Sequence, residues 1–332
     1  MNLVQLDKVN KLLIVRLSSL GDILLTTPLI RMIKQKYPAI EIDFVVRQEY
    51  KDLLILNPHL RNILIYNNAK DKLNILKNKI CENNYDLIID LQNNLRSWML
   101  LKCYGSSAIG FKKNNINKFL LVHFKINKLK NAKQIPVRYA STLENFQLDD
   151  KGLELFADKT KSAVLDGVDN IIGICPGSKH FTKMWGEEYF IQLGNLLIEN
   201  GFKIVLFGGK DDFDVCERIN SKLSSAINLC NDNNILQTAA DMRCCKVIYC
   251  NDSGLMHTAT AVNIPVIAFF GSTVKEFGFT PYNSKNLILE NNSLSCRPCT
   301  HIGRDRCPEK HFKCMKEITP QLAFEKLSLL LN

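Results

Sequence analysis

Four short polar segments combine residue types that could bind a phosphate or move a proton. The first, Ser18–Asp22, joins a flexible glycine to a carboxylate at the expected start of a helix. A carboxylate placed there can act as a general base on an incoming hydroxyl group. An aspartate at a helix start is also a very common cap, and spacing alone favours that structural role for Asp22.

The second segment, residues 176–185, is rich in groups that suit a phosphate. Ser178 and Thr182 offer hydroxyls, and Lys179 or Lys183 supplies a positive charge. The spacing of a Walker A loop is absent. An ordinary polar loop fits the same residues equally well, so both interpretations stay open.

The other two segments also follow expected strands. In Phe207–Asp214, glycines are followed by acids, a weak pattern that resembles ribose binding because carboxylates accept bonds from sugar hydroxyls. Asn251–His257 opens a helix, whose unpaired N–H groups and positive dipole end attract anions. His257 alone would fit a buried core histidine, but the segment as a whole favours an anion site at Gly254.

Strands of the predicted fold must position these four segments. Each segment follows an apolar run that predicts a buried strand, and helical patterns separate successive runs. These patterns include residues around 49–56, and residues 187–199 with Gly201 as the expected C-terminal stop. Alternating strands and helices indicate parallel sheets with crossover helices, so we expect an α/β protein with two doubly wound, Rossmann-like sheets. The expected strands are residues 11–16, 40–46, 63–66 and 87–90 in the first half, and 171–175, 203–207, 247–249 and 265–270 in the second.

A stretch without a clear pattern, residues 145–170, predicts a linker between two domains. We expect an N-terminal domain over 1–160 and a C-terminal domain over 161–318. The final helix, within 319–332, could pack back on the N-terminal domain. Two such domains bind ligands in a central cleft, outside the carboxyl ends of their strands.

The charge of the chain is unevenly distributed. The net charge is +10, and residues 1–160 carry all of the excess. No acidic residue lies between Asp90 and Glu144, where ten basic residues occur. This segment predicts an anionic partner: nucleic acid, an anionic membrane surface or a phosphorylated acceptor. No apolar run approaches the roughly 18 to 20 residues that a membrane-spanning helix needs, so we expect a soluble protein.

Twelve cysteines are spread over 332 residues without a secretion signal, which predicts reduced thiols in the cytoplasm. Cys81 and Cys103 are among eight that lie in or beside apolar runs, where cysteine acts as a small hydrophobe. The last four could bind zinc, although a second C-x2-C pair is absent. A redox-active loop and simple packing remain alternatives, and a structural role is favoured over a catalytic one. These four are Cys296, Cys299, Cys307 and Cys314.

Together the segments resemble glycosyltransferase family 9, the ADP-heptose:lipopolysaccharide heptosyltransferases. The resemblance covers nearly the whole chain, in order. It rests on Arg16–Pro28, Cys175–Ser178 with Lys183–Trp185, Val205–Gly208 and Asn251–His257.

This resemblance implies a GT-B fold, with the acceptor in the N-terminal half and the donor in the C-terminal half. It implies an inverting transfer, without a metal or other cofactor, of a heptose from an ADP-sugar to the inner core of lipopolysaccharide. The enzyme would be cytoplasmic and peripherally associated with the inner membrane, with no nucleic-acid partner. The basic first half would steer it towards an anionic glycolipid.

The resemblance also implies roles for individual residues. Asp22 would be the catalytic base, and Lys183 would bind the diphosphate. Asp252 and the amides of Ser253 and Gly254 would hold the phosphate and sugar, supported by His257. Either Asp212 or Asp214 would take the ribose. Ser178 and Thr182 complete the expected donor-binding residues, and the expected acceptor-binding residues are Ser19, Gly21 and Arg96.

Two alternatives remain at this point. A family 9 enzyme could use another nucleotide-sugar or a later acceptor, because acceptor choice lies in the basic half. A basic nucleic-acid-binding protein with a cysteine-rich metal site fits the charge superficially. Residues 91–143 contain few aromatic side chains for stacking on bases, which disfavours this second alternative.

Overall fold

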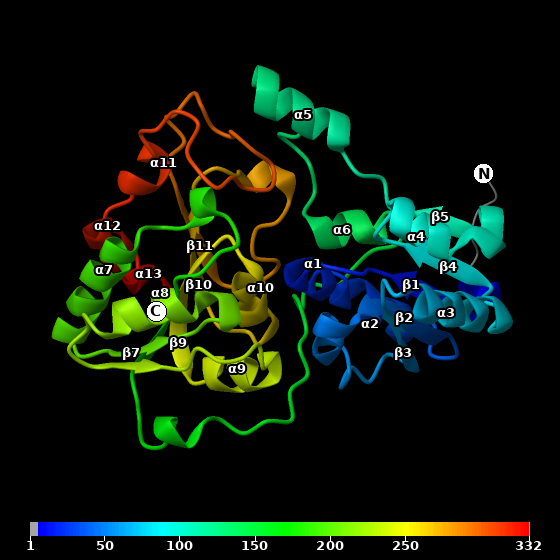
Figure 1. Cartoon of the computed structure of the whole chain (residues 1–332), viewed down its shortest axis with the longest axis horizontal. Coiled ribbons are helices and arrows are strands. Elements are labelled where there is room, and N and C mark those ends of the chain that lie inside the picture. The colour runs from blue at the N-terminus through cyan, green and yellow to red at the C-terminus, as the bar shows by residue number, and fades with distance from the viewer. Residues whose placement is uncertain (1–5, 332) are drawn as a thin grey trace. The chain divides into compact units, whose positions relative to one another are not determined.

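A computed structural model describes residues 6–331 of the chain, which form two compact units (Figure 1). The first unit comprises residues 6–113 and 133–156, and the second comprises residues 114–132 and 157–331. The segment 114–132 therefore belongs to the second unit, although the predicted boundary at residue 160 placed it in the first domain.

The first unit is built on a five-stranded parallel sheet with the strand order β3-β2-β1-β4-β5. The central strand, Leu-Leu-Ile-Val after Lys11, is buried on both faces, as continuous apolar strands of parallel sheets are. The doubly wound arrangement predicted from the sequence is confirmed. The strands are β1 (Lys11–Val15), β2 (Glu41–Arg47), β3 (Asn62–Tyr66), β4 (Leu87–Asp90) and β5 (Ala108–Gly110).

Helices connect these strands. The helix expected after β1 is divided into α1 and α2, with Pro28 in the first turn of α2, where its missing N–H costs nothing. A short 3-10 helix, Gln48–Leu53, stands where an α-helix was predicted over residues 49–56. The α-helices of this unit are α1 (Leu20–Leu24), α2 (Thr27–Lys36), α3 (Lys70–Glu82), α4 (Leu95–Leu100) and α6 (Ile135–Ala140).

The second unit contains a six-stranded parallel sheet with the order β11-β10-β9-β6-β7-β8. Its core includes Trp185, whose ring stacks on Phe269 at a centroid distance of 4.1 Å. The strands are β6 (Ile171–Cys175), β7 (Lys203–Leu206), β8 (Ala226–Asn228), β9 (Cys245–Asn251), β10 (Val266–Phe270) and β11 (Asn286–Glu290).

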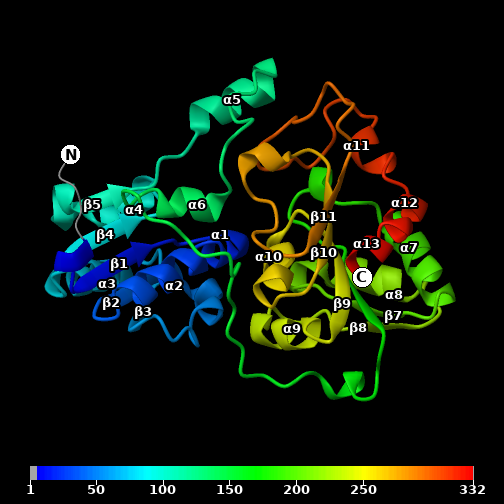
Figure 2. The same ribbon diagram turned by 180° about the vertical axis from the view of Figure 1, so that it is seen from behind.

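Helices cover both faces of the second sheet. Figures 1 and 2 show α7 and α8 on one side and α9 and α10 on the other. Helix α7 ends at Asn200, and Gly201 follows with a positive φ of 81°, the expected glycine stop. The α-helices are α5 (Asn115–Phe124), α7 (Glu187–Glu199), α8 (Phe213–Asn220), α9 (Ile235–Met242), α10 (Gly254–Ala261), α11 (Lys313–Lys316), α12 (Pro320–Glu325) and α13 (Ser328–Leu331).

The C-terminal helices pack on the second unit itself. Ala323, Leu327 and Leu330 are buried in its core, and the Tyr249 hydroxyl donates to the carbonyl oxygen of Ala323 at 3.0 Å. Packing of residues 319–332 on the N-terminal domain stays a prediction. Helices α12 and α13 pack on α7 and β9, which belong to the unit that immediately precedes them in the chain.

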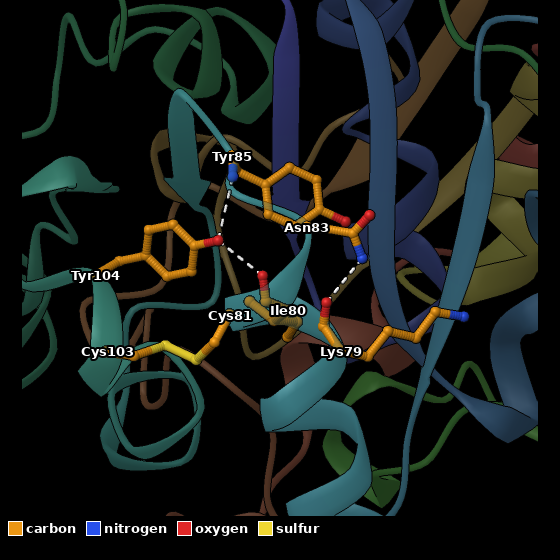
Figure 3. Close-up of a disulfide and its surroundings, with 7 residues drawn as sticks. All are labelled: Lys79, Ile80, Cys81, Asn83, Tyr85, Cys103 and Tyr104. Carbon is orange, nitrogen blue, oxygen red and sulfur yellow. Dashed lines mark hydrogen bonds between the residues drawn. A yellow bond between two sulfur atoms is a disulfide. The ribbon is translucent and has the colours of Figure 1, made fainter.

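Cys81 and Cys103 form a disulfide (Figure 3), whereas the sequence predicted reduced thiols. The bond joins the end of α3 to a 3-10 helix over Lys102–Ser107. Beside it, the Tyr104 hydroxyl donates to the carbonyl oxygen of Ile80 at 2.7 Å and accepts from the Tyr85 N–H at 3.1 Å. The chain path between the two cysteines brings them together, which their apolar local sequences do not reveal.

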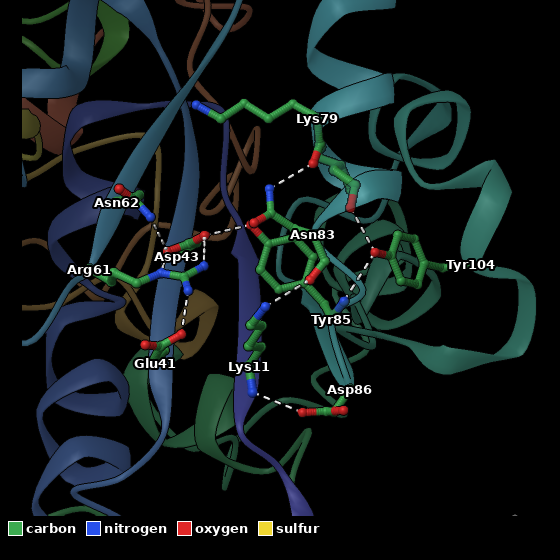
Figure 4. A network of polar contacts seen from close by, with 11 residues as sticks. Lys11, Glu41, Asp43, Arg61, Asn62, Lys79, Asn83, Tyr85, Asp86 and Tyr104 are labelled. Atoms are coloured by element: carbon green, nitrogen blue, oxygen red, sulfur yellow. Dashed lines mark hydrogen bonds and ion pairs between the residues drawn. The ribbon is translucent and has the colours of Figure 1, made fainter.

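A polar network lies at the amino ends of β3 and β4 (Figure 4). The buried Asp43 carboxylate accepts two bonds from Arg61, at 2.9 and 2.6 Å, and one from the Tyr85 hydroxyl at 2.6 Å. Burial opposes the charge of Asp43, but these donors outweigh burial and hold its pKa below the ordinary value. The network joins the amino ends of the strands, whereas the segment that contains Asp22 lies at their carboxyl ends.

None of the helices within residues 6–331 is both long and apolar enough to cross a membrane.

Candidate active site

Both sheets reverse their winding direction at one pair of strands, where ligands of such folds bind. In the first sheet this pair is β1 and β4, and in the second it is β6 and β9. Asp22, Lys183 and Asp252 lie in the segments after β1, β6 and β9, and Asp90 is the last residue of β4. Strand order therefore brings the predicted segments together within each unit.

Asp22 occupies the third position of α1, and both of its carboxylate oxygens are engaged. Oδ2 accepts from the backbone N–H of Ser19 at 3.1 Å and from its hydroxyl at 2.8 Å. Oδ1 lies 2.6 Å from Nη2 of Arg16. The N-cap residue is Ser19 and not Asp22, which spacing had favoured, and Asp22 completes a capping box with it from the third helical position. An ionised carboxylate has about four acceptor positions, so these three bonds leave one for an incoming hydroxyl.

Arg16 holds the Asp22 carboxylate in place. Its guanidinium is buried and also donates to the carbonyl oxygens of Ser18, at 2.9 Å, and Leu91, at 2.7 Å. The guanidinium carbon lies 5.8 Å from the centre of the Tyr139 ring. A planar fork with several fixed acceptors orients its partner better than a flexible lysine would. Sequence reasoning missed this residue, although a charged residue directly after a buried apolar strand was a usable signal.

Asp90 adds a second carboxylate at the end of β4. It is buried and accepts from the Ser97 hydroxyl at 2.6 Å and from the N–H of Asn93 at 2.8 Å. Burial raises its pKa. Burial and the nearby charge of Arg16 lower the pKa of Lys113. The first unit therefore presents two carboxylates and two cations at its switch point, and of these four residues the sequence singled out Asp22 alone.

The three expected acceptor-binding residues differ in their surroundings. Ser19 is exposed and bonded to Asp22, whereas Gly21 is buried inside α1. Arg96 is exposed in the first turn of α4, where its backbone N–H donates to the Asn94 side chain at 3.0 Å. Their contact with an acceptor stays a prediction.

In the second unit, Lys183 and Asp252 form an ion pair. Nζ of Lys183 lies 2.7 Å from Oδ2 of Asp252, and the side chains are 17% and 8% exposed. The Thr273 hydroxyl donates to the same oxygen at 2.7 Å. A lysine with part of its surface open can still approach an anion, while its partner fixes its position. Thr273, which follows β10, was not predicted.

The amino end of α10 lies directly after this pair. Ser253 precedes the helix, and its buried hydroxyl has no hydrogen-bond partner among the described residues. Gly254 begins the helix, and His257 is buried within it. An unused hydroxyl at a helix N-terminus provides a donor where the backbone N–H groups already favour an anion. The arrangement fits the phosphate site expected at Asn251–His257.

Asn251 connects the two switch-point segments of this unit. Its buried amide donates to the carbonyl oxygen of Pro176 at 2.7 Å and accepts from the N–H of Trp185 at 2.9 Å. The segments after β6 and β9 are therefore fixed to each other. The sequence placed Asn251 in the motif but did not predict this function.

The two candidate ribose-binding residues, Asp212 and Asp214, differ in position. Asp212 is half-buried and accepts from the N–H of Gly209 at 3.0 Å. Its carboxylate lies so close to Gly177 that a Cβ atom at position 177 would overlap it. Burial raises the pKa of Asp212. Asp214 is exposed in the first turn of α8. Only Asp212 borders the segment after β6, and ribose binding by either residue stays a prediction.

The cysteine-bearing segment is hydrogen-bonded to the segments that follow β6 and β10. Thr182 is buried, and its hydroxyl accepts from the N–H of Arg304 at 2.8 Å. The buried Arg297 donates to the carbonyl oxygens of Gly271, at 2.6 Å, and Thr273, at 3.0 Å. Thr182 is thus a support for the segment, and its direct contact with a donor remains a prediction. Ser178 is partly exposed in the same segment.

The four late cysteines lie in this supporting segment. Burial raises the pKa of Cys314 to about 12, and Sγ of Cys296 lies 3.9 Å from Nε2 of His311. Within residues 6–331, no group of three or more histidine, cysteine or acidic side chains is arranged to hold a metal ion. The contacts of Thr182 and Arg297 favour the structural role expected for this segment.

Comparison with known proteins finds one family model and several relatives that match the chain. Residues 74–311 match the model of glycosyltransferase family 9 (heptosyltransferase). Lipooligosaccharide heptosyltransferase 2 of Haemophilus ducreyi is 26% identical over 355 residues, covering 97% of this chain and 99% of that protein.

Two solved structures share the fold over almost the whole chain. A family 9 glycosyltransferase from Veillonella parvula superposes with a TM-score of 0.80 at 20% identity, covering 100% of this chain and 99% of that one. The ADP-heptose lipopolysaccharide heptosyltransferase II of E. coli superposes with a TM-score of 0.73 at 22% identity, covering 97% and 98%.

Proposed function

Because the chain belongs to glycosyltransferase family 9, the heptosyltransferase family, we propose that it transfers a heptose from ADP-heptose to the inner core of lipopolysaccharide. The chain is a glycosyltransferase, and its two parallel-sheet units have the GT-B architecture. The names of its relatives support both the donor and the acceptor.

The ion pair of Lys183 with Asp252, at the amino end of α10, carries the proposal. Departure of ADP leaves negative charge on a phosphate oxygen. A fixed ammonium group, the unpartnered Ser253 hydroxyl and the first N–H groups of α10 would stabilise that charge without reorganising. Asp252 would keep Lys183 in place before the donor binds.

Asp22 would act as the general base. The acceptor hydroxyl oxygen forms a bond to the anomeric carbon, its proton passes to Asp22, and the bond from that carbon to ADP breaks. A single displacement of this kind inverts the anomeric configuration. The free acceptor position on the Asp22 carboxylate and its fixed orientation by Arg16 support this role.

The proposal includes catalysis without a metal ion. The charge that a divalent cation would supply to the leaving diphosphate would come instead from Lys183 and the amino end of α10. Activity should therefore be the same in excess chelator and in added magnesium.

The acceptor would be reached at the cytoplasmic face of the inner membrane, with the protein peripherally associated. The support is the charge of the chain, because ten basic residues and no acidic one lie between Asp90 and Glu144. Such a segment attracts a glycolipid that bears phosphate and carboxylate groups.

The test uses the purified protein, ADP-heptose and lipopolysaccharide that ends before the first or the second heptose. We expect the acceptor mass to rise by one heptose, equal release of ADP, and inversion at the anomeric carbon by NMR. Turnover with a different nucleotide-sugar but none with ADP-heptose would refute the proposed donor. Salt-sensitive retention on DNA, with no stabilisation by ADP-heptose, would favour a nucleic-acid-binding protein instead.

A further inference from the structure

Helix α5 and the segment that follows it expose large apolar side chains. Ile116 is 76% exposed, Phe119 54% and Phe124 62%, and Ile126 is also exposed. We call residues 114–132 the α5 surface. Contiguous exposed apolar side chains on a protein surface mark an interaction site.

The apolar face of α5 is separate from the face that holds the helix in the fold. Leu121 and Val122 are buried in a small cluster with Val274 and Phe277. With 3.6 residues per turn, Ile116 lies well away from both buried residues around the helix axis, and Phe119 lies opposite Leu121 but only one turn before Val122. Packing of the second unit therefore does not require apolar residues at positions 116 and 119.

The charge around this face has one dominant sign. Residues 114–132 contain four lysines and no acidic residue. Lys125 is held by the carbonyl oxygens of Cys296, at 3.0 Å, and Pro298, at 2.7 Å, which fixes the end of the helix. Lys128 and Lys130 are exposed. Two acidic side chains lie near the segment: Glu276, which accepts from Asn127 at 3.3 Å, and Glu309, whose charge acts on Lys125.

We propose that the α5 surface docks the protein on an anionic phospholipid bilayer. Ile116, Phe119 and Phe124 enter the boundary between headgroups and acyl chains, while Lys128 and Lys130 contact anionic headgroups. The inference deepens the proposed function, since a lipid-linked acceptor lies in such a surface. A second copy of this chain fits less well, because a symmetric contact would place lysines against lysines.

Helix α4 in the first unit shows the same combination of residues. Leu95, Trp98 and Met99 are exposed at helical spacing, next to Arg96. Tryptophan favours the level of lipid headgroups. The acid-free part of the sequence thus carries two surfaces of this type, one in each unit.

The test is co-sedimentation of the full-length protein with vesicles of phosphatidylcholine, with and without phosphatidylglycerol. We expect wild-type protein to bind the anionic vesicles, and Ile116→Ser with Phe119→Ser to reduce partitioning about tenfold or more. Lys128→Glu with Lys130→Glu should abolish the preference for anionic vesicles. The matched control is Ile75→Ser, because Ile75 is 66% exposed on α3, and its partitioning should equal that of wild type.

Two further measurements separate docking from the transferase reaction. The α5 variants should keep wild-type stabilisation by ADP-heptose and wild-type turnover of a deacylated, water-soluble acceptor. If wild-type protein binds vesicles but transfers no heptose, the proposed function fails while docking stands. Equal partitioning of wild type and the variant with Ile116→Ser and Phe119→Ser overturns docking. Docking is also overturned if wild type forms a dimer that this variant loses while it still binds vesicles.

Discussion

Replacement of Asp22 by asparagine tests the proposed base most directly. Asparagine keeps the shape of the side chain and an oxygen for Arg16 or Ser19, but it cannot accept a proton from the acceptor. General base catalysis contributes about 10² to 10⁴-fold to a rate, which is about 3–5.5 kcal/mol of the barrier. We therefore expect kcat to fall by about two to four orders of magnitude.

The same change weakens local structure, and that effect must be separated from the loss of a base. Asp22→Asn replaces a charge-assisted bond to Arg16 with a neutral one, and a bond to a charged group contributes about 1.5–3 kcal/mol. Arg16 keeps its bonds to the carbonyl oxygens of Ser18 and Leu91, so the site should stay folded. Ser19→Ala is the matched control, because it removes one capping bond to Asp22 and leaves the carboxylate.

Turnover is measured as ADP release at saturating donor and acceptor, donor affinity by calorimetry, and stability by urea unfolding. Asp22→Asn should keep donor affinity close to wild type. Ser19→Ala should lower the free energy of unfolding by about 0.5–1.5 kcal/mol with little change in kcat. Wild-type turnover in Asp22→Asn would refute the assignment, and an equal loss in Ser19→Ala would show that capping, not proton transfer, limits the rate.

Three other perturbations have expected outcomes. Lys183→Met should raise the donor dissociation constant about 10 to 100-fold, since it removes a charged contact, and calorimetry that shows only acceptor affinity lost would contradict the assignment. Asp43→Asn should cost about 3 kcal/mol of unfolding free energy at pH 7, because Arg61 loses its buried partner. The pKa of Asp43 is lowered in the fold, so the extra stability of wild type over Asp43→Asn is complete above about pH 4 and is lost as the pH falls through the folded pKa. Urea unfolding at several pH values would disprove this if the free energies of unfolding of the two proteins did not converge at low pH. Reduction of the bond between Cys81 and Cys103, 22 residues apart, should lower stability by about 3 kcal/mol, and unchanged urea unfolding in dithiothreitol would show that the bond does not restrain the unfolded chain.

The sequence by itself determined the buried framework. β4 and β6 occupy the predicted residues 87–90 and 171–175, and α7 spans the predicted residues 187–199. Central strands of a parallel sheet are buried on both faces, so they must be continuous apolar runs that a local pattern reveals. The motifs after these strands were found for the same reason, because functional segments of this fold follow the carboxyl ends of strands.

The short edge strands β5, β8 and β11 escaped prediction. An edge strand is half-exposed and only three to five residues long here, so its apolar pattern is weak. The 3-10 helix in place of the helix predicted over 49–56 has the same origin, a pattern too short to distinguish the two.

Only the tertiary structure decided how the functional side chains pair. Lys183 meets Asp252 and Thr182 meets Arg304 because strand order and a long supporting segment bring distant residues together. Arg16 gains three acceptors from turns that local propensity does not specify. Such pairings depend on sheet order and on burial in three dimensions, and a one-dimensional periodicity carries no information about either.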